Sequence, residues 1–429
     1  MTTHRMSNWV GRRGWGCISL VLAVLLFSGS ARGAMEIEGL DNNTAPASNY
    51  DRYDNSSSWI GLPANWPGGA PGSNTSSPYV WSGVGRDANN GTWGTMIAPQ
   101  FFISANHYHP AIGDTLQFNY NNDPNGPSET ETVLAGAWMQ AALPGNGGAD
   151  GDVWIGLLSQ AVSSNVAIYP ILKMNFNSEY GGLGISTFGL SATIPGTVTT
   201  VRMGRNVIDA GTANYYTGLN PADYNGVSNF YGFQYTYNNT ASNRGVGNDE
   251  AQVVVGDSGA PTFFLYGGSS PALIGTHWLA GTSGGNLVTV DTLDSDYVNY
   301  NPALNDVQKV MNQLADANSV ARENVTLESP VLGDFNLDGK FDASDIPAMI
   351  AALSNLNSYE SLHGMNASYL DYIGDLNDDG VVNNADLQAM IALLKMGYGT
   401  MSSVPEPASV VLLGLGGLAA LAGAWRRRA

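Results

Sequence analysis

Cysteine is nearly absent from this chain, whose 429 residues include only Cys17. Cys17 lies in an amino-terminal segment that is expected to be removed, so the mature protein is expected to contain no disulfide and to depend on core packing. Basic residues are also few, with 17 lysines and arginines against 36 aspartates and glutamates and a formal net charge of −19. This acidic balance argues against a nucleic-acid partner and favours an extracellular setting that is rich in calcium or salt.

Histidine is scarce too, so a catalytic base has few candidate positions. The chain contains His4, His107, His109, His277 and His363. The apolar run at 96–103 predicts a buried strand that gives way to a loop at His107, so this residue stands out. His109 lies two residues further on and is an alternative base, whereas His277 is expected to be a structural or pocket-wall residue.

Residues 256–261 read Gly-Asp-Ser-Gly-Ala-Pro and lie between two strand-like runs. A serine hydroxyl is a poor nucleophile unless a base removes its proton and backbone amides stabilise the oxyanion that forms on the attacked carbonyl. Glycines beside Ser258 allow a tight turn and let a substrate carbonyl approach the backbone. The string therefore predicts Ser258 as a nucleophile and the amides of Gly256 and Ser258 as an oxyanion hole.

Three strings together resemble the trypsin-like serine endopeptidases of the chymotrypsin fold. Residues 103–108 are similar to the family's Thr-Ala-Ala-His-Cys string, 152–158 to its Asp-Ile-Ala-Leu-Leu strand, and 256–261 to its Gly-Asp-Ser-Gly-Gly-Pro string. The resemblance implies that Ser258 attacks, that His107 acts as general base and then acid, and that Asp152 fixes the imidazole tautomer. Asp150 is an alternative to Asp152, which is preferred because it directly abuts the apolar run. The chain order His, Asp, Ser differs from that of subtilisins and α/β-hydrolases.

The resemblance also implies a fold and a specificity pocket. The fold is all-β, with two six-stranded antiparallel barrels within residues 77–325, and catalysis needs no cofactor. Abundant glycine, asparagine and aromatic residues in short strand-like runs agree with this, and apolar spacing predicts a helix at 307–317. Gln252 is implied at the base of the primary pocket and Trp278 in its wall, which favours protein or peptide substrates without strict selection for lysine or arginine. In zymogen-type members of the family, a freed amino terminus pairs with the aspartate before the serine, which is Asp257 here. The amino-terminal string of those members is missing from this chain, so Asp257 is expected to pair within the chain instead.

The amino terminus has the layout of a secretory signal. Arginines precede an apolar run at 18–27, and small residues follow it up to Ala34. This layout predicts a signal peptide over 1–33 that is cleaved after Gly33 or Ala34, and a transmembrane anchor is the weaker alternative because the apolar run is short. Residues 34–76 are rich in asparagine, serine and proline and are expected to form a lead-in to the first domain.

Two twelve-residue segments, 334–345 and 375–386, repeat a pattern typical of calcium loops. Oxygen-bearing side chains stand at loop positions 1, 3, 5, 9 and 12, glycine stands at position 6, and position 7 offers a backbone carbonyl. The predicted ligands of the first loop are Asp334, Asn336, Asp338, the carbonyl of Lys340, Asp342 and Asp345. Those of the second loop are Asp375, Asn377, Asp379, the carbonyl of Val381, Asn383 and Asp386.

Each loop leads into an apolar helix, expected at 346–353 and 387–394, and no helix is expected before either loop. This arrangement, with aspartate at position 12, resembles a type I dockerin over residues 331–398. The resemblance implies a small α-helical module that binds two calcium ions and a cohesin domain on another protein. The alternative is a spacer that calcium stabilises and that binds no cohesin.

The carboxy-terminal segment 404–429 begins Val-Pro-Glu-Pro, continues with an apolar stretch at 408–425 and then carries three arginines. It resembles the PEP-CTERM sorting signal of Gram-negative bacteria, which implies an exosortase-type processing enzyme. The stretch is long enough to form a transmembrane helix in the inner membrane with the arginines on the cytoplasmic side, and a plain carboxy-terminal anchor is the alternative. Both interpretations place residues 34–403 outside the inner membrane, at the cell surface or in the extracellular space.

Together these features predict a secreted or surface-directed serine endopeptidase that forms an acyl-enzyme intermediate and is tethered through its calcium module. A catalytically silent scaffold or binding protein of an extracellular cohesin–dockerin assembly is the alternative from another class. An esterase that uses the same triad is a third interpretation, which peptide and ester probes would separate from a peptidase.

Overall fold

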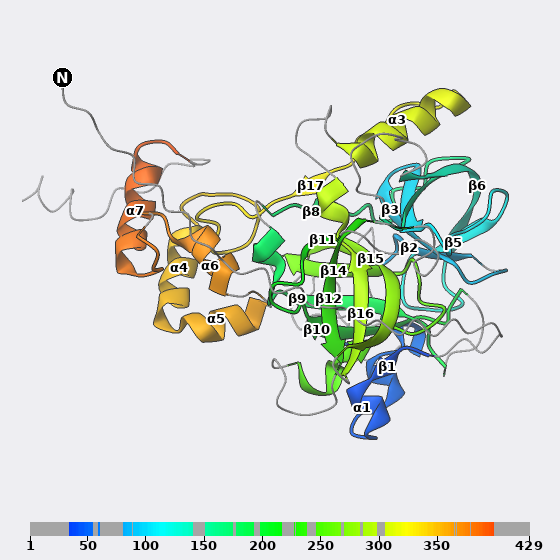
Figure 1. Ribbon diagram of the computed structural model, residues 1–429. Helices are drawn as coiled ribbons and strands as arrows, with labels where there is room; N and C mark the ends of the chain where they lie inside the picture. The colour runs from blue at the N-terminus through cyan, green and yellow to red at the C-terminus, as the bar shows by residue number, and fades with distance from the viewer. Residues whose placement is uncertain are drawn as a thin grey trace, which may run out of the picture.

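The computed structural model describes residues 34–54, 59–60, 80–87, 89–139, 151–174, 177–192, 198–216, 227, 229–237, 246–266, 270–283, 286–297, 305–363, 365, 367–377 and 379–398. Within these ranges the chain is mostly β with few helices, and the carboxy-terminal helices gather at one end of the molecule (Figure 1). Short 3-10 helices lie at Ala47–Asn49, Arg52–Asp54, Asn177–Tyr180, Gly247–Asp249 and Asp294–Tyr297.

Six strands in the first half of the chain form a closed barrel. They are β2 (Val84–Asp87), β3 (Trp93–Ala98), β4 (Phe101–Ala105), β5 (Thr115–Asn119), β6 (Ser128–Trp138) and β7 (Val153–Leu158), in the order β2-β3-β4-β7-β6-β5. Aromatic rings fill this barrel opposite glycines. A Cβ on Gly156 would lie 2.2 Å from Cζ of Phe102, and a Cβ on Gly85 would lie 2.4 Å from Cε1 of Phe118. Glycine is therefore needed where the rings approach the strands.

The strand β4 is buried on both faces, which explains its continuous apolar sequence. Phe102 joins the core inside the barrel, whereas its neighbours Phe101 and Ile103 join a second core outside it. Successive side chains of a strand point to opposite faces, so one strand contributes to both cores. The apolar run at 96–103, predicted as one strand, is in fact the end of β3, a turn at 99–100 and the start of β4. Proline at the turn cannot donate to a strand ladder.

A nine-stranded sheet forms the second half of the fold. Its strands are β8 (Ile171–Leu172), β9 (Gly184–Gly189), β10 (Arg202–Val207), β11 (Asn214–Tyr216), β12 (Phe230–Tyr237), β14 (Pro261–Tyr266), β15 (Ser270–Ser283), β16 (Asn286–Thr292) and β17 (Leu327–Glu328). Seven of them follow the order β10-β9-β14-β15-β16-β12-β11, while β8 joins β15 and β17. The region after β10 meets β12, since Asp209 N donates to Gln234 O over 2.8 Å. Of the two six-stranded barrels expected, the described strand pairing closes the first, and the second half is this sheet.

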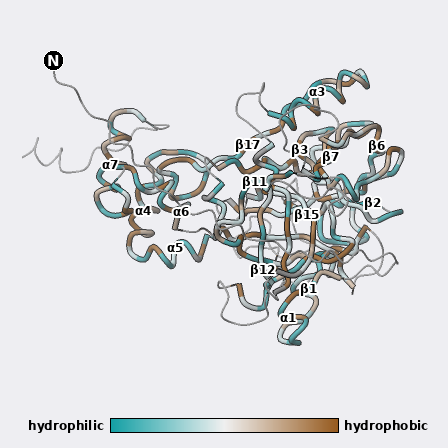
Figure 2. The backbone as a smooth tube through the Cα atoms, in the orientation of Figure 1, coloured by the Kyte–Doolittle hydropathy of each residue, from teal (hydrophilic) through white to brown (hydrophobic). Residues whose placement is uncertain are grey.

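A shared core joins the barrel to the sheet. Trp81 contacts Phe188 and Phe263, with ring centroids 5.1 and 5.4 Å apart. The helix α3 (Asp306–Asn318), predicted at 307–317, packs its apolar side on the same core. It begins where the side chain of Asn305 accepts a hydrogen bond from Gln308 N. Figure 2 shows hydrophobic and hydrophilic segments alternating along α3, as expected for a helix with one buried side.

The start of the lead-in attaches to the second half of the fold. The strand β1 (Glu36–Ile37) pairs antiparallel with β13 (Ala251–Gln252), and the short helix α1 (Glu38–Asp41) follows it. Met35 is buried, and its N donates to Leu190 O over 2.9 Å. The residues that directly follow the predicted signal peptide therefore lie beside β13, the strand that leads to the turn carrying the predicted nucleophile (residues 256–259, here called the nucleophile turn).

Four helices follow β17: α4 (Asp345–Ser354), α5 (Leu356–His363), α6 (Ala367–Gly374) and α7 (Asn384–Lys395). The helices α4 and α7 confirm those predicted after the two loops. The expectation that no helix precedes either loop is wrong for the second loop, because α6 ends directly before it. Its eight residues give too short an apolar repeat to be recognised in the sequence.

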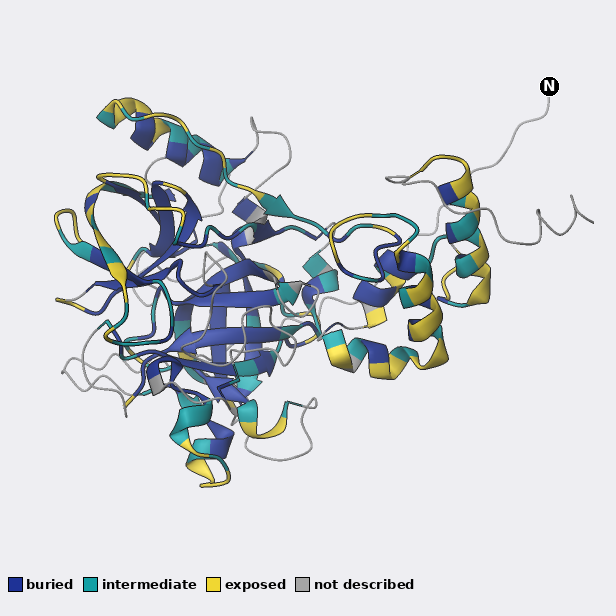
Figure 3. Ribbon diagram, turned by 180° about the vertical axis from the view of Figure 1, so that it is seen from behind, coloured by how far each residue is buried: buried dark blue, intermediate teal, exposed yellow. Residues whose placement is uncertain are grey.

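These four helices pack against the nine-stranded sheet. Phe264 of β14 contacts Tyr369 of α6, with ring centroids 5.5 Å apart, and one continuous apolar core links the sheet to the helices. Figure 3 shows buried residues on the sides of the helices that turn towards the sheet and exposed residues on the outer sides. None of the described helices has the length and apolar character of a membrane-crossing segment. The transmembrane segment expected at 404–429 and the signal peptide expected at 1–33 lie outside the described residues.

Candidate active site

The three residues of the predicted triad lie where the barrel meets the second half of the fold. His107 follows the end of β4, and Asp152 stands directly before β7. These strands are antiparallel neighbours with Ala105 opposite Val153, so the end of one lies beside the start of the other. Ser258 comes from the turn between β13 and β14.

His107 lies between the other two residues and contacts both. Its backbone N donates to Asp152 Oδ1 over 3.0 Å, its Nδ1 hydrogen-bonds Asp152 Oδ2, and its Nε2 lies 2.9 Å from Ser258 Oγ. An ionised carboxylate only accepts hydrogen bonds, so Nδ1 carries the proton and Nε2 directs a lone pair at the serine hydroxyl. This tautomer can remove the serine proton.

The carboxylate of Asp152 is buried away from solvent. Asp152 is 0% exposed, whereas the side chain of His107 is 22% exposed. Burial raises the pKa of Asp152, and the charge and hydrogen bonds of His107 act in the opposite direction. Because no water screens the carboxylate, its charge acts strongly on the adjacent imidazole and stabilises an imidazolium there.

The nucleophile turn depends on glycine on both sides of Ser258. Gly256 and Gly259 have φ values of +106° and +81°, which L side chains rarely adopt. A Cβ on Gly259 would also lie 2.6 Å from Ser104 Oγ. Within the described part of the chain, the amides of Gly256 and Ser258 make no hydrogen bond. They are the two donors predicted for the oxyanion hole.

Asp257, which precedes the nucleophile, is buried and paired within the chain, as expected. Its Oδ1 accepts from Leu190 N over 2.6 Å and its Oδ2 from Val254 N over 2.8 Å. Burial raises the pKa of Asp257 to about 6, although these hydrogen bonds favour the charged form. A Cβ on Gly189 would lie 2.8 Å from Asp257 Oδ2, so the carboxylate is packed closely against the backbone.

His109, the alternative base, makes contacts of its own. The ring of His109 stacks on Trp154 with centroids 4.1 Å apart, and its Nδ1 lies 2.9 Å from Pro110 O. The contact with Ser258 is made by His107. Asp150 lies outside the described residues.

The two predicted pocket residues are both buried. Gln252 lies in β13 and is 4% exposed, and its Oε1 has no hydrogen-bond partner among the described residues. Trp278 of β15 meets Phe230 edge-on at 4.3 Å, and Phe230 stacks on Tyr216 at 4.8 Å. These rings of β11 and β12 were not anticipated from the sequence, because only the sheet pairing brings them to Trp278.

The two predicted calcium loops share several internal hydrogen bonds. In the first, Asp334 accepts from the amides of Asp338 and Gly339, and in the second, Asp375 accepts from those of Asp379 and Gly380. The last aspartate of each loop, Asp345 or Asp386, accepts from amides of its own loop. Gly339 and Gly380 have φ values of +81° and +84°, which explains glycine at the sixth position.

The second loop also meets the distance requirement of a metal site. Carboxylate oxygens of Asp375, Asp379 and Asp386 lie within 4.8 Å of one another. The donors are carboxylates, side-chain amides and backbone carbonyls, all hard oxygen ligands that suit calcium rather than a softer transition metal. The residues present therefore fit the ion predicted from the loop sequence.

Comparison with known proteins identifies the carboxy terminus of the chain. Residues 403–428 match the PEP-CTERM protein-sorting motif. The motif implies export, membrane or surface association through carboxy-terminal sorting, and processing by an exosortase-type enzyme. No curated protein matches the chain.

Proposed function

We propose that this protein is an exported serine endopeptidase. The observation that carries the proposal is the set of contacts from Asp152 through His107 to Ser258. A buried acid, an imidazole in the required tautomer and a serine on a glycine turn are the three parts that activate a hydroxyl nucleophile. The amides of Gly256 and Ser258 supply a place for the developing negative charge.

In the proposed reaction, His107 Nε2 removes the Ser258 proton as Oγ attacks the carbonyl carbon of a peptide bond. The amides of Gly256 and Ser258 stabilise the oxyanion. His107 then donates the proton to the leaving amine, the C–N bond breaks and an acyl-enzyme remains. His107 next deprotonates a water that attacks the ester carbonyl, and it returns the proton to Ser258 Oγ. Asp152 remains ionised and stabilises the imidazolium in both halves of the cycle.

The two-barrel fold of the trypsin-like peptidases is the architecture we propose for residues 77–325. One closed barrel, a second sheet with β10 and β12 in contact, and a triad at their junction support it. Asn206 Nδ2 of β10 donates to Thr236 O of β12 over 3.2 Å, as would be needed near a barrel seam. A signal peptide over 1–33 and a transmembrane tail over 404–429 complete the proposed domain order.

The proposed substrates are proteins or peptides with a medium-sized or apolar side chain before the cleaved bond. Gln252 carries no charge that would select lysine or arginine, and the wall includes Trp278 with Phe230 packed against it. An apolar side chain placed against these rings would gain burial without needing an ionic partner.

The carboxy-terminal helices and their loops form, in our proposal, a dockerin-like module that holds two calcium ions. Asp334, Asp345, Asp375 and Asp386 would contribute carboxylates, and the ions would neutralise charges that otherwise repel one another. A cohesin domain is the proposed partner. The alternative is a calcium-stabilised spacer that binds no cohesin. In either case the module shares an apolar core with the second sheet.

The test is active-site labelling of the full chain with a fluorophosphonate probe in calcium buffer. Labelling is expected in the unmodified protein and is expected to disappear in Ser258→Ala and His107→Ala. His109→Ala is the matched control, since this neighbouring histidine does not contact the serine, and it should retain labelling. Cleavage of peptide probes would then indicate a peptidase, whereas cleavage of ester probes alone would indicate an esterase. A folded protein that never labels would refute the proposal and favour a silent scaffold.

A further inference from the structure

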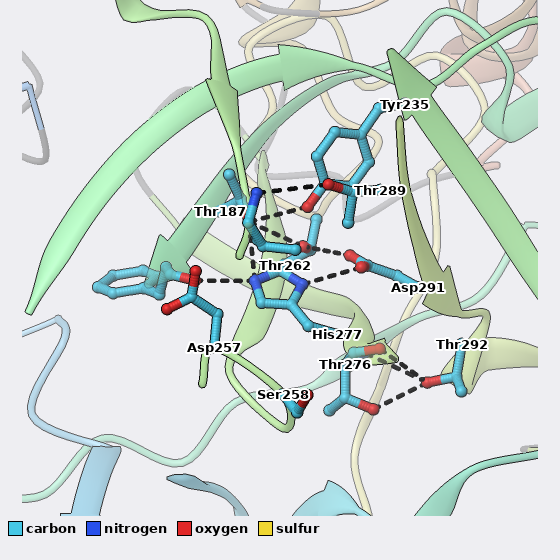
Figure 4. A network of polar contacts seen from close by, with 12 residues as sticks. Thr187, Tyr235, Asp257, Ser258, Thr262, Thr276, His277, Thr289, Asp291 and Thr292 are labelled. Carbon is cyan, nitrogen blue, oxygen red and sulfur yellow. Dashed lines mark hydrogen bonds and ion pairs between the residues drawn. The ribbon is translucent and has the colours of Figure 1, made fainter. Parts of the chain in front are cut away.

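A second histidine–aspartate pair lies behind the nucleophile turn (Figure 4). His277 of β15 is 1% exposed, and its Nδ1 lies 2.8 Å from Oδ1 of the fully buried Asp291 in β16. Its Nε2 lies 2.8 Å from Phe188 O and 2.9 Å from Thr187 Oγ1, both at the end of β9. The triad does not include this pair.

The partners of His277 define its protonation. A carbonyl oxygen only accepts, so Nε2 must carry a proton to bond Phe188 O. Nδ1 meets a carboxylate whose other oxygen, Asp291 Oδ2, accepts a hydrogen bond from Thr262 Oγ1 over 2.6 Å. With both ring nitrogens donating and Asp291 accepting on both oxygens, His277 is an imidazolium paired with a carboxylate in the core.

The backbone of His277 is bonded to the residues that follow the nucleophile. Gly259 N donates to His277 O over 3.0 Å, and His277 N donates to Ala260 O over 3.0 Å. A displacement of His277 in β15 would therefore move Gly259, the residue next to Ser258.

The side chain of His277 is also linked to the nucleophile turn through hydrogen bonds to the end of β9. It holds Phe188 O, while Asp257 Oδ1 accepts from Leu190 N two residues further on. Asp257 is the residue directly before Ser258. The segment from Phe188 to Leu190 is thus held by His277 at one end and by the nucleophile turn at the other.

We propose that His277 is a positioning residue for Ser258, acting as a buried cation that fixes the nucleophile turn from both sides. The inference rests on the proposed serine-hydrolase function and adds to it a residue that touches neither substrate nor triad. Fixing the turn matters because small displacements of a nucleophile from its base greatly reduce the rate.

The charges around His277 determine how the pair responds to pH. Burial lowers the pKa of His277, but the charge and hydrogen bond of Asp291 and the charge of Asp257 raise it, and the net direction is upwards. Burial raises the pKa of Tyr235, which bonds Thr187, and that of Asp294, which faces Asp291, so both favour their neutral forms. Arg86 acts on Asp257 from the barrel.

The sign of the effect follows from the raised pKa. The contribution of the pair is fully present below the unfolded value of 6.5 and is lost as pH rises through the folded value. Loss of the His277 proton therefore predicts a fall of activity on the alkaline side of the pH profile.

The first experiment measures the rate of fluorophosphonate labelling of the full chain from about pH 6 to about pH 10. Asp291→Asn is expected to slow labelling by about 10- to 100-fold and to move the alkaline fall to lower pH. Thr292→Val is the matched control, since Thr292 is a buried neighbour on β16 that bonds Thr276 and Asp294. It is expected to keep the unmodified pH profile. A folded Asp291→Asn protein with an unchanged profile would overturn the inference.

A second experiment does not depend on the Asp291 variant folding. In the Ser258→Ala protein labelled with 15N-histidine, NMR is expected to show both ring nitrogens of His277 still protonated at pH 6.5, the ordinary pKa of a histidine. His277→Gln assigns the signal by removing it. A His277 ring with one proton under these conditions would contradict the inference. If the unmodified protein reacts with the fluorophosphonate probe and the Ser258→Ala protein shows a singly protonated His277, the inference alone is refuted. An unmodified protein that never reacts with the probe refutes the proposed function and the inference with it.

Discussion

The substitution Gly259→Ala tests how closely the nucleophile turn is packed against the barrel. At φ +81° an alanine costs about 1–2 kcal/mol from backbone strain. Its Cβ would also lie 2.6 Å from Ser104 Oγ and 3.0 Å from Ala105 N, and Ser104 is fully buried in β4. Forcing extra volume into such a site typically costs about 1–3 kcal/mol in addition to the backbone strain. We expect the free energy of unfolding to fall by about 2–5 kcal/mol.

The matched control is Gly211→Ala, at φ +75° with no atom within 4 Å of the added Cβ. It isolates the backbone strain, so it is expected to cost about 1–2 kcal/mol and to leave labelling unchanged. Urea unfolding measures the stability of both variants, and fluorophosphonate labelling measures the site. Because residue 259 adjoins Ser258, Gly259→Ala is expected to slow labelling by about 100-fold. Equal labelling rates in the two folded variants would refute the packing argument.

Three further predictions concern the acids of the chain. Asp152→Asn should lower the labelling rate by about 10⁴-fold while the protein stays folded, because the amide selects the wrong imidazole tautomer; a loss under tenfold would argue against the triad. The pKa of Asp257 is raised from 3.8 to about 6, so the folded state binds this proton more tightly than the unfolded state. The free energy of unfolding should therefore fall by up to about 3 kcal/mol as pH rises from 3.8 to about 6. Urea titrations should show this slope in the unmodified protein and a flatter one in Asp257→Asn. Removal of calcium should reduce helical circular dichroism, and Asp379→Asn should weaken calcium binding in calorimetry whereas Asp371→Asn, in α6 outside the loop, should not.

The triad and the loops could be predicted from sequence because each depends on short local strings. Ser258 is marked by the glycines of its own turn, and His107 by the apolar strand that precedes it. The calcium loops repeat a fixed spacing of oxygen donors, which their internal hydrogen bonds follow. Such features are set by neighbours in the chain, so no knowledge of the tertiary fold is needed to find them.

What could not be predicted depends on contacts between distant residues. His277 was expected to be structural or to line a pocket, but its charge follows from Asp291 and Phe188 on two other strands. The placement of Met35 beside Leu190 depends on the pairing of β1 with β13, for which a two-residue strand gives no sequence pattern. Helix α6 was missed because Tyr369 and its neighbours fit the second sheet rather than a long amphipathic repeat.

The second half of the fold is assembled from both ends of the described chain. Met35 and β1 attach beside β13, and Tyr369 of α6 closes over Phe264 of β14. An exported chain cannot complete these contacts until both Met35 and α6 have crossed the membrane. Folding of the second half of the fold is thereby coupled to the end of translocation, so that a half-exported chain lacks part of the core behind the proposed active site.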